Sequence, residues 1–465
     1  MCRACAFPAR IAVDASLSVV AVELFLKRDR GVEGGRVSAV QEVEFTSAWR
    51  RCAALKNIDI GLLGHGRVGQ ALSALVTSER ERLEALGLNV RVVAALARDA
   101  AKPRRQDVPT VYDAGAFFRH QFDAVIEVMG GVDPAYGLVR RALEAGIPVV
   151  SANKTLLAAH GDDLAAISRR HGTPLAFDAA VVAGVPFLGA LSRRPLLGAT
   201  RRITGIINGT SHFLLTAVAA GASFDDALVE ACARGYAEPD SRADISGRDA
   251  AEKLTILLRL AGVAGIATSD ITTVGIDVLT PRDFRAAREL DGVLKPIALA
   301  CFEDGRAGAW VGPALVDRAH PAAQSGGVLN FVEFAGASAL PVTFWGPGAG
   351  PDVTAATILD DVIEVATTGR PEPSRPPRAV AIDDLVVPPF GPWYLRIAGS
   401  GLGISEAADA CAVHGVPAVR VCDVGDAIAV RTVPVSWSRL TPLVDMLRAI
   451  GADVLALPVI DGAVS

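Results

Sequence analysis

The strongest constraint on the fold of this chain is a regular alternation of apolar strands and amphipathic helices that begins near residue 57. Residues 58–63 (IDIGLL) predict a buried strand, a glycine-rich turn follows, and apolar side chains spaced three and four apart predict a helix over 68–86. Further strands are expected at 90–97, 123–128 and 147–150, with a helix at 134–145. This spacing indicates right-handed βαβ units and therefore a parallel sheet.

Beyond residue 178 the pattern changes to mixed strands and helices, which predicts a second domain of α+β type. A glycine-rich run around Phe344 opens another amphipathic helix, and the segment RPEPSRPPR at 370–378 predicts a linker. About 75 residues follow with a strand–loop–helix–strand pattern, enough for one small α+β domain. The expected fold class is α/β, with a Rossmann-type doubly wound parallel sheet followed by these two α+β domains.

Composition excludes several classes of protein. Hydrophobic residues make up 51% of the chain and charged residues 21%, so wholesale disorder is excluded. With 46 Lys and Arg against 51 Asp and Glu, nothing favours binding to nucleic acid or to an anionic membrane. The 7 scattered cysteines are not a disulfide framework and no apolar run is long enough to span a bilayer, so a cytoplasmic location is expected.

The first predicted strand and helix are joined by a G-x-G-x-x-G loop, made of Gly64, His65, Gly66, Arg67, Val68 and Gly69. In a dinucleotide site the first glycine makes the tight turn, the second lets a pyrophosphate approach the backbone, and the third packs helix against strand. The strand–turn–helix context predicts dinucleotide binding. The alternative is a glycine-rich turn without a ligand.

The end of the second predicted strand bears on the choice between NAD and NADP. An acidic residue about 20 positions beyond the loop usually binds the ribose hydroxyl of NAD. Here Arg98 stands at that point, and further cations follow at Lys102, Arg104 and Arg105. Cations there suit the 2′-phosphate of NADP. The neighbouring Asp99 keeps NAD open, and a solvated loop is the alternative explanation of the cations.

Polar residues also follow two apolar runs further along the chain. Ser151-Ala152-Asn153-Lys154 comes directly after a buried strand, at the edge where open parallel sheets bind ligands. Asn208-Gly209-Thr210-Ser211-His212 ends another apolar run and opens a helix. Neither segment is decisive by itself.

The densest group of carboxylates is Glu238, Asp240, Asp244 and Asp249. Asp249 and Lys253 stand four residues apart at the start of a strongly apolar helix and so share one face. An exposed ion pair is the ordinary explanation of that spacing. Because the helix beyond Lys253 is nearly all apolar, we expect this lysine to point inward, where it could bind a substrate and move a proton.

Taken in order, these motifs resemble the homoserine dehydrogenase family from about residue 58 to residue 366. They comprise GHGRVG, the A-N-K at 152–154, DAAVVAGVP at 178–186, INGTSHFLL, the block from Gly235 to Lys253, and the late GPGAGPDVTAA. The segment after the linker is similar to a diverged ACT-type regulatory module.

The chain departs from the family pattern at four positions. Ser241 replaces a proline, His212 replaces the last asparagine of N-G-T-T-N, and Ser151 replaces the threonine before A-N-K. Asp178 stands where the family has a glutamate at a monovalent-cation site. The lysines, Glu238 and Asp249 are retained, so activity is expected.

The resemblance implies the interconversion of homoserine and aspartate 4-semialdehyde, with these site residues. The catalytic residues are Lys253, Lys154 and Asp249. The substrate-binding residues are Glu238, Asp244, Asn208, Gly209, Thr210 and Lys154. The cofactor-binding residues are the six of the glycine loop with Arg98, Lys102, Ser151, Lys154, Gly348 and Thr354. A sodium or potassium ion is expected at Asp178, Val181 and Ala183.

Both lysines would polarise the substrate oxygen, and burial and their mutual repulsion would lower their pKa values. NADP(H) is expected to be preferred or used alongside NAD(H). The partners are a small-molecule substrate, an amino-acid effector at the C-terminal domain, and further copies in a homodimer or homotetramer. A dehydrogenase of another small amino or oxo acid, and a non-catalytic amino-acid sensor, are the alternatives.

The expected domain boundaries follow from these patterns. Residues 1–56 are either an N-terminal extension or the result of a start codon placed too early. They are followed by the dinucleotide-binding domain (57–185) and the substrate-binding and dimerisation domain (186–340). The remaining parts are a helix returning to the dinucleotide-binding domain (341–370), a proline-rich linker (371–392) and the ACT-like domain (393–465).

Overall fold

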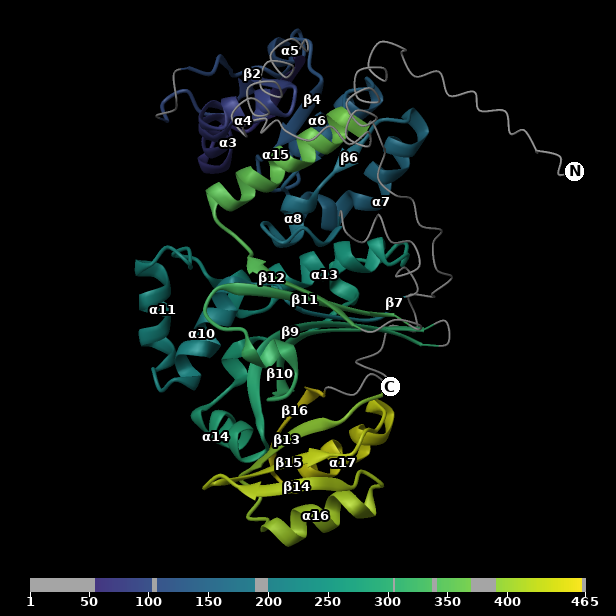
Figure 1. The fold of residues 1–465 in the computed structure, drawn as a ribbon. Helices are drawn as coiled ribbons and strands as arrows, with labels where there is room; N and C mark the ends of the chain where they lie inside the picture. The colour runs from purple at the N-terminus through teal and green to yellow at the C-terminus, as the bar shows by residue number, and fades with distance from the viewer. Residues whose placement is uncertain are drawn as a thin grey trace, which may run out of the picture. The chain divides into compact units, whose positions relative to one another are not determined.

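The computed structural model describes residues 55–102, 107–188, 200–303, 306–336, 341–368 and 390–461. The fold of these residues is drawn in Figure 1. The N-terminal extension and nearly all of the proline-rich linker lie outside the described residues, as do Arg104 and Arg105. Within the described part, no helix is long and apolar enough to cross a membrane.

The first sheet is parallel and has six strands in the order β3-β2-β1-β4-β5-β6. The strands are β1 (Lys56–Leu63), β2 (Leu88–Leu96), β3 (Thr110–Val111), β4 (Ala124–Glu127), β5 (Val149–Ser151) and β6 (Leu175–Ala176). This is the strand order of a dinucleotide-binding Rossmann sheet, in which ligands bind beyond the carboxyl ends of the central strands. The predicted parallel α/β fold is confirmed.

Helices cover both faces of this sheet (Figure 1). On one face lie α3 (Arg67–Ser78) and α15 (Pro351–Thr368), whose apolar side chains share a core with β1. On the other lie α6 (Ala135–Glu144) and α7 (Lys154–His171). The late helix α15 therefore completes the first domain although almost 300 residues separate it from α3.

Two local predictions need correction. The single helix expected over 68–86 is divided at Glu79 into α3 and α4 (Arg80–Ala85), and this change of direction lets Leu83 pack beneath β2. The glycine-rich run does not begin a helix at Phe344, because Phe344 lies in the edge strand β12 (Val342–Pro347) and α15 starts only at Pro351.

The second sheet has ten strands, with the path β12-β11-β7-β9-β10-β16-β13-β15-β14 and β8 beside β10. Its strands before the C-terminal module are β7 (Thr200–Ile206), β8 (Thr272–Thr273), β9 (Gly292–Glu303), β10 (Arg306–Asp317), β11 (Leu329–Gly336) and β12. The helices are α10 (Gly209–Ala219), α11 (Phe224–Ala233), α12 (Arg242–Ile245), α13 (Arg248–Leu260) and α14 (Pro281–Glu289). Helix α13 contacts both α7 and β9, so it connects the two sheets.

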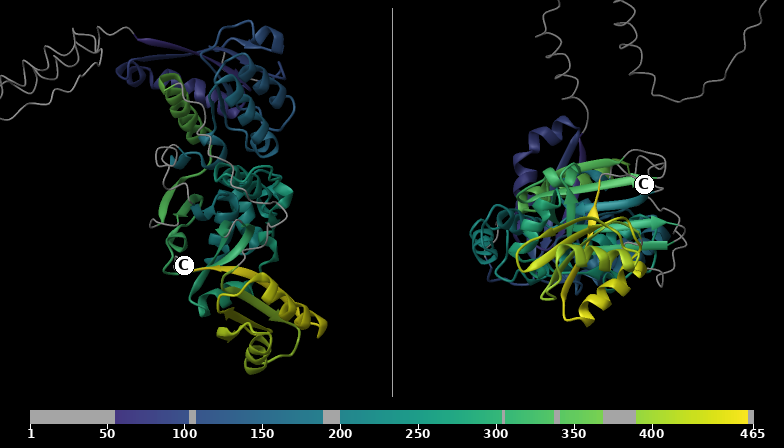
Figure 2. Two further views of the ribbon diagram at one scale, coloured as in Figure 1. Left: turned by 90° about the vertical axis from the view of Figure 1, so that its right-hand side faces the viewer. Right: turned by 90° about the horizontal axis from the view of Figure 1, so that it is seen from below.

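The C-terminal module has a complete β-α-β-β-α-β pattern (Figure 2). Its elements are β13 (Trp393–Ala398), α16 (Ile404–Val413), β14 (Ala418–Asp423), β15 (Ala427–Thr432), α17 (Trp437–Ala449) and β16 (Asp453–Ile460). The strand order β16-β13-β15-β14 is that of a ferredoxin-like sheet. Strand β16 also pairs with β10 through Val459 and Ile460, so the module continues the second sheet.

Candidate active site

The glycine loop between β1 and α3 has the backbone geometry that a dinucleotide requires. Gly64 has φ = 107°, and a Cβ there would lie 2.8 Å from the carbonyl oxygen of Val128. A Cβ at Gly69 would lie 2.5 Å from the carbonyl oxygen of Gly64, so this glycine permits the close packing of helix on strand. A Cβ at Gly66 would meet no atom within 4 Å, which leaves open space above the loop. These are the three roles expected of the loop glycines.

The start of α3 is also suited to an anion. Gly66 caps the helix without any side-chain hydrogen bond, so amide groups of the first turn are available to phosphate oxygens. His65 is turned inward, with Nδ1 3.2 Å from Thr110 Oγ1. Val68 is half-buried, and the exposed Arg67 forms an ion pair of 3.2 Å with Glu238. The residues present therefore fit a bound dinucleotide.

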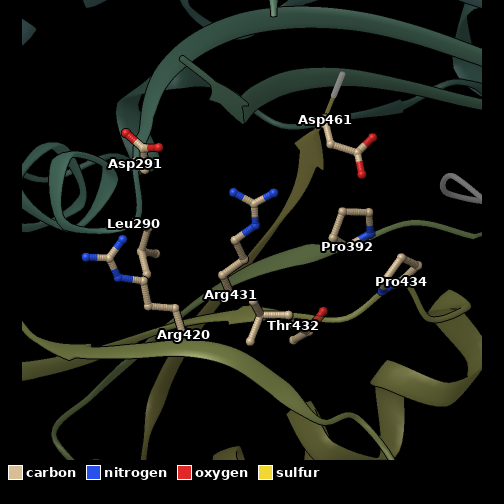
Figure 3. A pocket seen from close by; sticks show the side chains of 9 residues that line it. Leu290, Asp291, Pro392, Arg420, Arg431, Thr432, Pro434 and Asp461 are labelled. Carbon is tan, nitrogen blue, oxygen red and sulfur yellow. The ribbon is translucent and has the colours of Figure 1, made fainter. Parts of the chain in front are cut away.

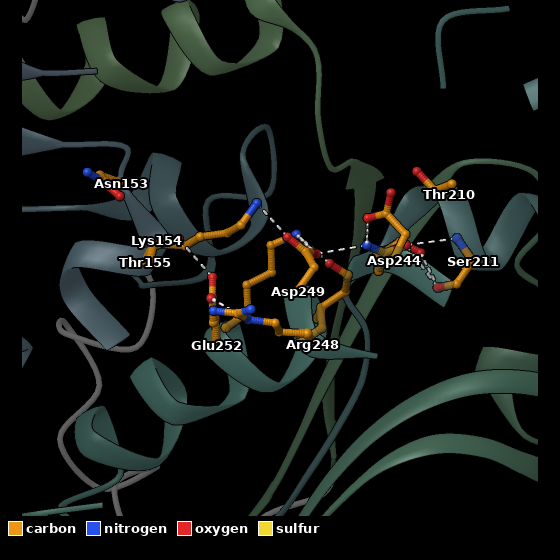
Figure 4. A network of polar contacts seen from close by, with 12 residues as sticks. Asn153, Lys154, Thr155, Thr210, Ser211, Asp244, Arg248, Asp249 and Glu252 are labelled. Atoms are coloured by element: carbon orange, nitrogen blue, oxygen red, sulfur yellow. Dashed lines mark hydrogen bonds and ion pairs between the residues drawn. The ribbon is translucent and has the colours of Figure 1, made fainter. Parts of the chain in front are cut away.

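A buried carboxylate, Asp249, holds the two predicted catalytic lysines together (Figure 4). Its Oδ1 lies 2.5 Å from Lys154 Nζ, and its Oδ2 lies 2.8 Å from Lys253 Nζ. Lys253 also donates to the carbonyl oxygen of Ile207 at 2.8 Å, and its side chain is only 11% exposed. Lys253 thus points inward, whereas the Lys154 side chain is 40% exposed and reaches the site from the first domain.

The charges in this group correct one expectation about the lysines. Burial alone would lower the pKa of Lys154, but the Asp249 carboxylate outweighs it and the pKa is raised. Burial would likewise raise the pKa of Asp249, but the two ammonium groups hold it well below the ordinary range. The predicted lowering of both lysine pKa values is therefore wrong for Lys154, because a carboxylate lies between the ammonium groups.

Asn208 joins two of the predicted carboxylates. Its side-chain amide donates to Asp244 Oδ1 at 2.6 Å and to Asp249 Oδ2 at 2.8 Å, while its Oδ1 accepts from the amide of Ser211 and caps α10. Burial raises the pKa of Asp244. The Thr210 hydroxyl donates to the carbonyl oxygen of Tyr236, and Gly209 lets the backbone approach Val328 closely.

Comparison with known proteins agrees with this geometry. A family model described as the homoserine dehydrogenase NAD-binding domain matches residues 64–178, and one described as homoserine dehydrogenase matches residues 186–363. The homoserine dehydrogenase of Corynebacterium glutamicum is 34% identical over 350 residues, which cover 73% of this chain and 78% of that protein. The chain belongs to the homoserine dehydrogenase family. It is thus an NAD(P)-dependent oxidoreductase, and the reaction of the family interconverts homoserine and aspartate 4-semialdehyde.

Further relatives support the same assignment. The homoserine dehydrogenase of Bacillus subtilis is 32% identical over 319 residues, covering 67% of this chain and 73% of that protein. The crystal structure of a homoserine dehydrogenase from Thiobacillus denitrificans matches with a TM-score of 0.78 and 30% identity, covering 88% of this chain and 99% of that one. Family membership favours homoserine over the alternative substrates, and favours an enzyme over a non-catalytic sensor.

Not every site residue implied by the homoserine dehydrogenase pattern joins the Asp249 group. Glu238 is exposed and faces Arg67 of the glycine loop, and Asp240 is paired with Arg242 on the surface. The family departure Ser241 is buried and its carbonyl accepts from the amides of Asp244 and Ile245, so it supports the short helix α12.

Another departure from the homoserine dehydrogenase pattern, His212, is hydrogen-bonded to residues outside the Asp249 group. It is fully buried, with Nδ1 2.8 Å from the carbonyl oxygen of Leu329 and Nε2 3.3 Å from Lys295 Nζ. Burial, and then Lys295, lower the pKa of His212 to about 4, so the ring is neutral near pH 7. Burial also lowers the pKa of Lys295 to about 8. This neutral histidine therefore lies on the buried face of α10, to which it belongs.

The other residues predicted to bind the cofactor lie in two places, at the end of β2 and in the segment that leads into α15. Arg98 is exposed just beyond the end of β2, and Lys102 is exposed four residues later in the chain. Between them, Asp99 accepts a hydrogen bond from the amide of Ala101 at 2.9 Å. A Cβ at Gly348 would lie 2.0 Å from the Asn330 side chain, so only glycine fits in the loop before α15. Thr354 lies in the first turn of α15, where its amide donates to the carbonyl oxygen of Gly350.

The residues expected to hold a cation lie on or just after the short helix α8 (Asp178–Val182). The amide of Asp178 donates to the buried Asp361 at 3.2 Å, and Val181 and Ala183 are buried. Among the described residues, no group of three His, Cys, Asp or Glu side chains could hold a metal ion. Any cation here would therefore depend on backbone carbonyls.

Sequence reasoning missed two buried carboxylates near the lysines. Glu127, at the end of β4, accepts hydrogen bonds from Ser151 and Asn153, and Glu252 accepts from Thr155 at 2.9 Å. The Ser151 hydroxyl is thereby engaged inside the protein. Nothing in the apolar run DAVIEV marked its glutamate as part of a site, because the side chains that bind it, those of Ser151 and Asn153, lie more than 20 residues away.

Proposed function

We propose that Lys253 and Lys154 act together on the oxygen atom that changes between alcohol and aldehyde in homoserine and aspartate 4-semialdehyde. The observation that carries this proposal is the Asp249 carboxylate, which bridges the two ammonium groups at 2.5 and 2.8 Å. When bound, the nicotinamide supplies or accepts the hydride. During aldehyde reduction Lys253 donates a proton to the developing alkoxide, and it takes the proton back in the reverse direction.

In this proposal the two lysines have different roles. The raised pKa of Lys154 makes it a poor proton donor, so it serves as a fixed positive charge beside the oxygen. Lys253 is the proton donor, and its ammonium group is held in place by the carbonyl oxygen of Ile207 and by the Asp249 carboxylate. Asp244 and Glu238 bind the substrate ammonium, with Asp244 held in place by Asn208. In the structure Glu238 is exposed and paired with Arg67 of the glycine loop.

Replacing Lys154 with alanine tests its proposed role. The variant should fold and lose at least about tenfold in kcat at saturating NADP⁺, since one group that stabilises transition-state charge can contribute roughly 100-fold or more. Steady-state rates of homoserine oxidation measure this loss, and fluorescence titration measures cofactor affinity. Lys154→Arg, which keeps the charge, should retain more activity than Lys154→Ala. Equal activity of the wild-type and Lys154→Ala proteins would remove this residue from the mechanism.

We also propose that NADP(H) is preferred to NAD(H) or used alongside it. The exposed guanidinium of Arg98 beyond β2 supports this, because it stands where NAD-specific sites place a carboxylate. Arg98→Glu should raise the KM for NADP⁺ far more than the KM for NAD⁺, measured with saturating homoserine. Equal changes for both cofactors would show that Arg98 does not contact the 2′-phosphate.

We also propose a sodium or potassium ion at the backbone carbonyls of Val181 and Ala183, with Asp178 nearby. Burial, and then the proximity of Asp178, raise the pKa of Asp361 well above its ordinary value, and a cation would relieve this crowding of carboxylates. Replacing both ions with a bulky organic cation at constant ionic strength should lower kcat. A rate unchanged by the replacement would argue against the ion.

For the C-terminal module we propose an ACT-like role in binding an amino-acid effector. A pocket of about 250 Å³ lies between the module and the residues that directly follow α14, Leu290 and Asp291 (Figure 3). Its lining includes Arg420 and Arg431 as well as Asp291 and Asp461, so it offers charges of both signs to a zwitterion, with Arg431 also paired with Asp317. An increase in melting temperature with one amino acid, reduced in Arg420→Ala, would support the effector site. No shift with any of the standard amino acids would oppose it.

We further propose that the protein forms a homodimer or homotetramer. The edge strand β12 carries Trp345 with half of its surface exposed, and such an edge can pair with another copy. Light scattering measures the mass directly, and a monomer would contradict this proposal.

A further inference from the structure

The carboxyl end of β4 carries a fully buried carboxylate, Glu127, that the mechanism above does not use. Its Oε1 accepts from the amide of Met129 at 2.8 Å and from Asn153 Nδ2 at 3.2 Å. Its Oε2 accepts from Ser151 Oγ at 2.7 Å. Burial raises the pKa of Glu127, while these hydrogen bonds favour the charged form. A buried carboxylate with several donors costs stability to build, so its position calls for an explanation.

The partners of Glu127 lead directly to the predicted catalytic lysine. Asn153 is the N-cap of α7, because its Oδ1 accepts from the amide of Leu156 at 3.1 Å. Its other side-chain atom, Nδ2, is held by Glu127 and by the carbonyl oxygen of Gly131 at 2.6 Å. Lys154 is the first residue of α7, so the orientation of Asn153 sets the point from which the Lys154 side chain reaches Asp249.

The same carboxylate is connected to the glycine loop. The amide of Met129 donates a hydrogen bond to Glu127. Met129 and the preceding residue, Val128, lie directly against Gly64. Gly130 and Gly131 continue the segment with φ values of 75° and 74°, and a Cβ at either would meet no atom within 4 Å. Glu127 therefore holds both the segment beside the dinucleotide loop and the start of the lysine helix.

We propose that Glu127, acting through Ser151 and Asn153, is a positioning residue that sets Lys154 relative to the cofactor loop. The inference rests on the proposed role of Lys154 and deepens it. Glu127 is hydrogen-bonded to Met129, Ser151 and Asn153 and not to either lysine, so its effect on turnover passes through Lys154. The geometry also gives Ser151 an inward role, in place of the cofactor contact expected from the sequence.

Two substitutions and one conservative replacement test the proposal. Glu127→Gln turns one accepting oxygen into a donor, and Ser151→Ala removes the hydroxyl that bridges Glu127 and the amide of Asn153. Each should lower kcat by about tenfold, more than it changes either KM, because displacing a reacting group by about 1 Å can cost on the order of 100-fold. Ser151→Thr keeps the hydroxyl and should restore most of the activity.

A comparison in the Lys154→Ala background separates positioning from general damage. If Glu127 acts through Lys154, adding Glu127→Gln to Lys154→Ala should change kcat by less than about twofold, since effects of residues that act as a unit are not additive. Ser168→Ala is the matched control for Ser151→Ala: Ser168 is also a buried serine, it lies on the helix α7 that begins at Lys154, and its hydroxyl donates to the carbonyl oxygen of Thr173. It should lower the melting temperature while leaving kcat unchanged.

The outcomes distinguish this inference from the proposed function on which it rests. Loss of turnover in Lys154→Ala with normal kcat in both Glu127→Gln and Ser151→Ala overturns only the role of Glu127. The same loss caused by Glu127→Gln with and without Lys154 also overturns it. Normal kcat in Lys154→Ala overturns the role of Lys154 itself. If Glu127→Gln fails to fold, Ser151→Ala and its threonine counterpart still decide the question.

Discussion

Replacing Lys253 with alanine should lower kcat for homoserine oxidation by at least about 100-fold, on the scale of general acid–base catalysis. The side chain of Lys253 is 11% exposed, and its ammonium group is held at 2.8 Å by both Asp249 and the carbonyl of Ile207. The variant should fold and bind NADP⁺ normally. Steady-state kinetics and a cofactor titration on the same preparation measure both effects.

The matched control for this variant is an ordinary surface pair with the same spacing. Arg140 and Glu144 stand four residues apart on α6, with a distance of 2.8 Å and side chains 51% and 41% exposed. Arg140→Ala should change stability very little and leave turnover unchanged, because exposed ion pairs contribute little. If Lys253→Ala behaved in the same way, Lys253 would be a structural partner of Asp249, and the proton donor would be Lys154 or a bound water.

Asp249→Asn should produce the largest loss of stability among the site variants. The substitution keeps the shape of the side chain but leaves Lys253 with a nearly buried charge and no carboxylate. Breaking one partner of a buried ion pair typically costs about 3 kcal/mol or more in the free energy of unfolding. Urea unfolding at neutral pH measures the loss. Asp240→Asn, which removes an exposed partner of Arg242, should change stability very little.

The stability difference between the wild type and Asp249→Asn should depend on pH, because of the pKa of Asp249. Its pKa is lower in the folded protein than the ordinary value of 3.8, so its ionised form favours the folded state. The contribution is fully present above about pH 4 and is lost as the pH falls through the lower, folded value. The stability difference between the wild type and Asp249→Asn should therefore shrink in acid. A difference that is constant down to pH 2 would contradict the ion-pair account.

Much of the site could be predicted because its motifs are local. The order of glycines in the loop specifies a turn, an open approach and a close contact, and each is found at Gly64, Gly66 and Gly69. The apolar run after Lys253 predicts the face that α13 buries, and this places the lysine inward. Such patterns depend on neighbours three or four residues away, which a single sequence displays directly.

The rest depends on contacts between distant segments. Lys154 and Asp249 lie almost 100 residues apart in the chain, so spacing cannot show that a carboxylate separates the two lysines. The predicted sign of the Lys154 pKa shift was wrong for this reason. Glu127 was missed because the side chains that bind it lie on β5 and at the start of α7. The partners of His212, a departure from the family pattern, are also distant in sequence, since its ring contacts Leu329 and Lys295.

The most direct test of the account is the absorbance of reduced cofactor when the purified protein is mixed with NADP⁺ and homoserine. We expect a steady increase that requires homoserine and is reduced at least about 100-fold in Lys253→Ala under the same conditions. Serine and threonine, which also carry a hydroxyl and an ammonium group, should support far slower reduction. No homoserine-dependent signal from a folded protein that binds NADP⁺, or an equal rate from Lys253→Ala, would contradict the assignment of this site.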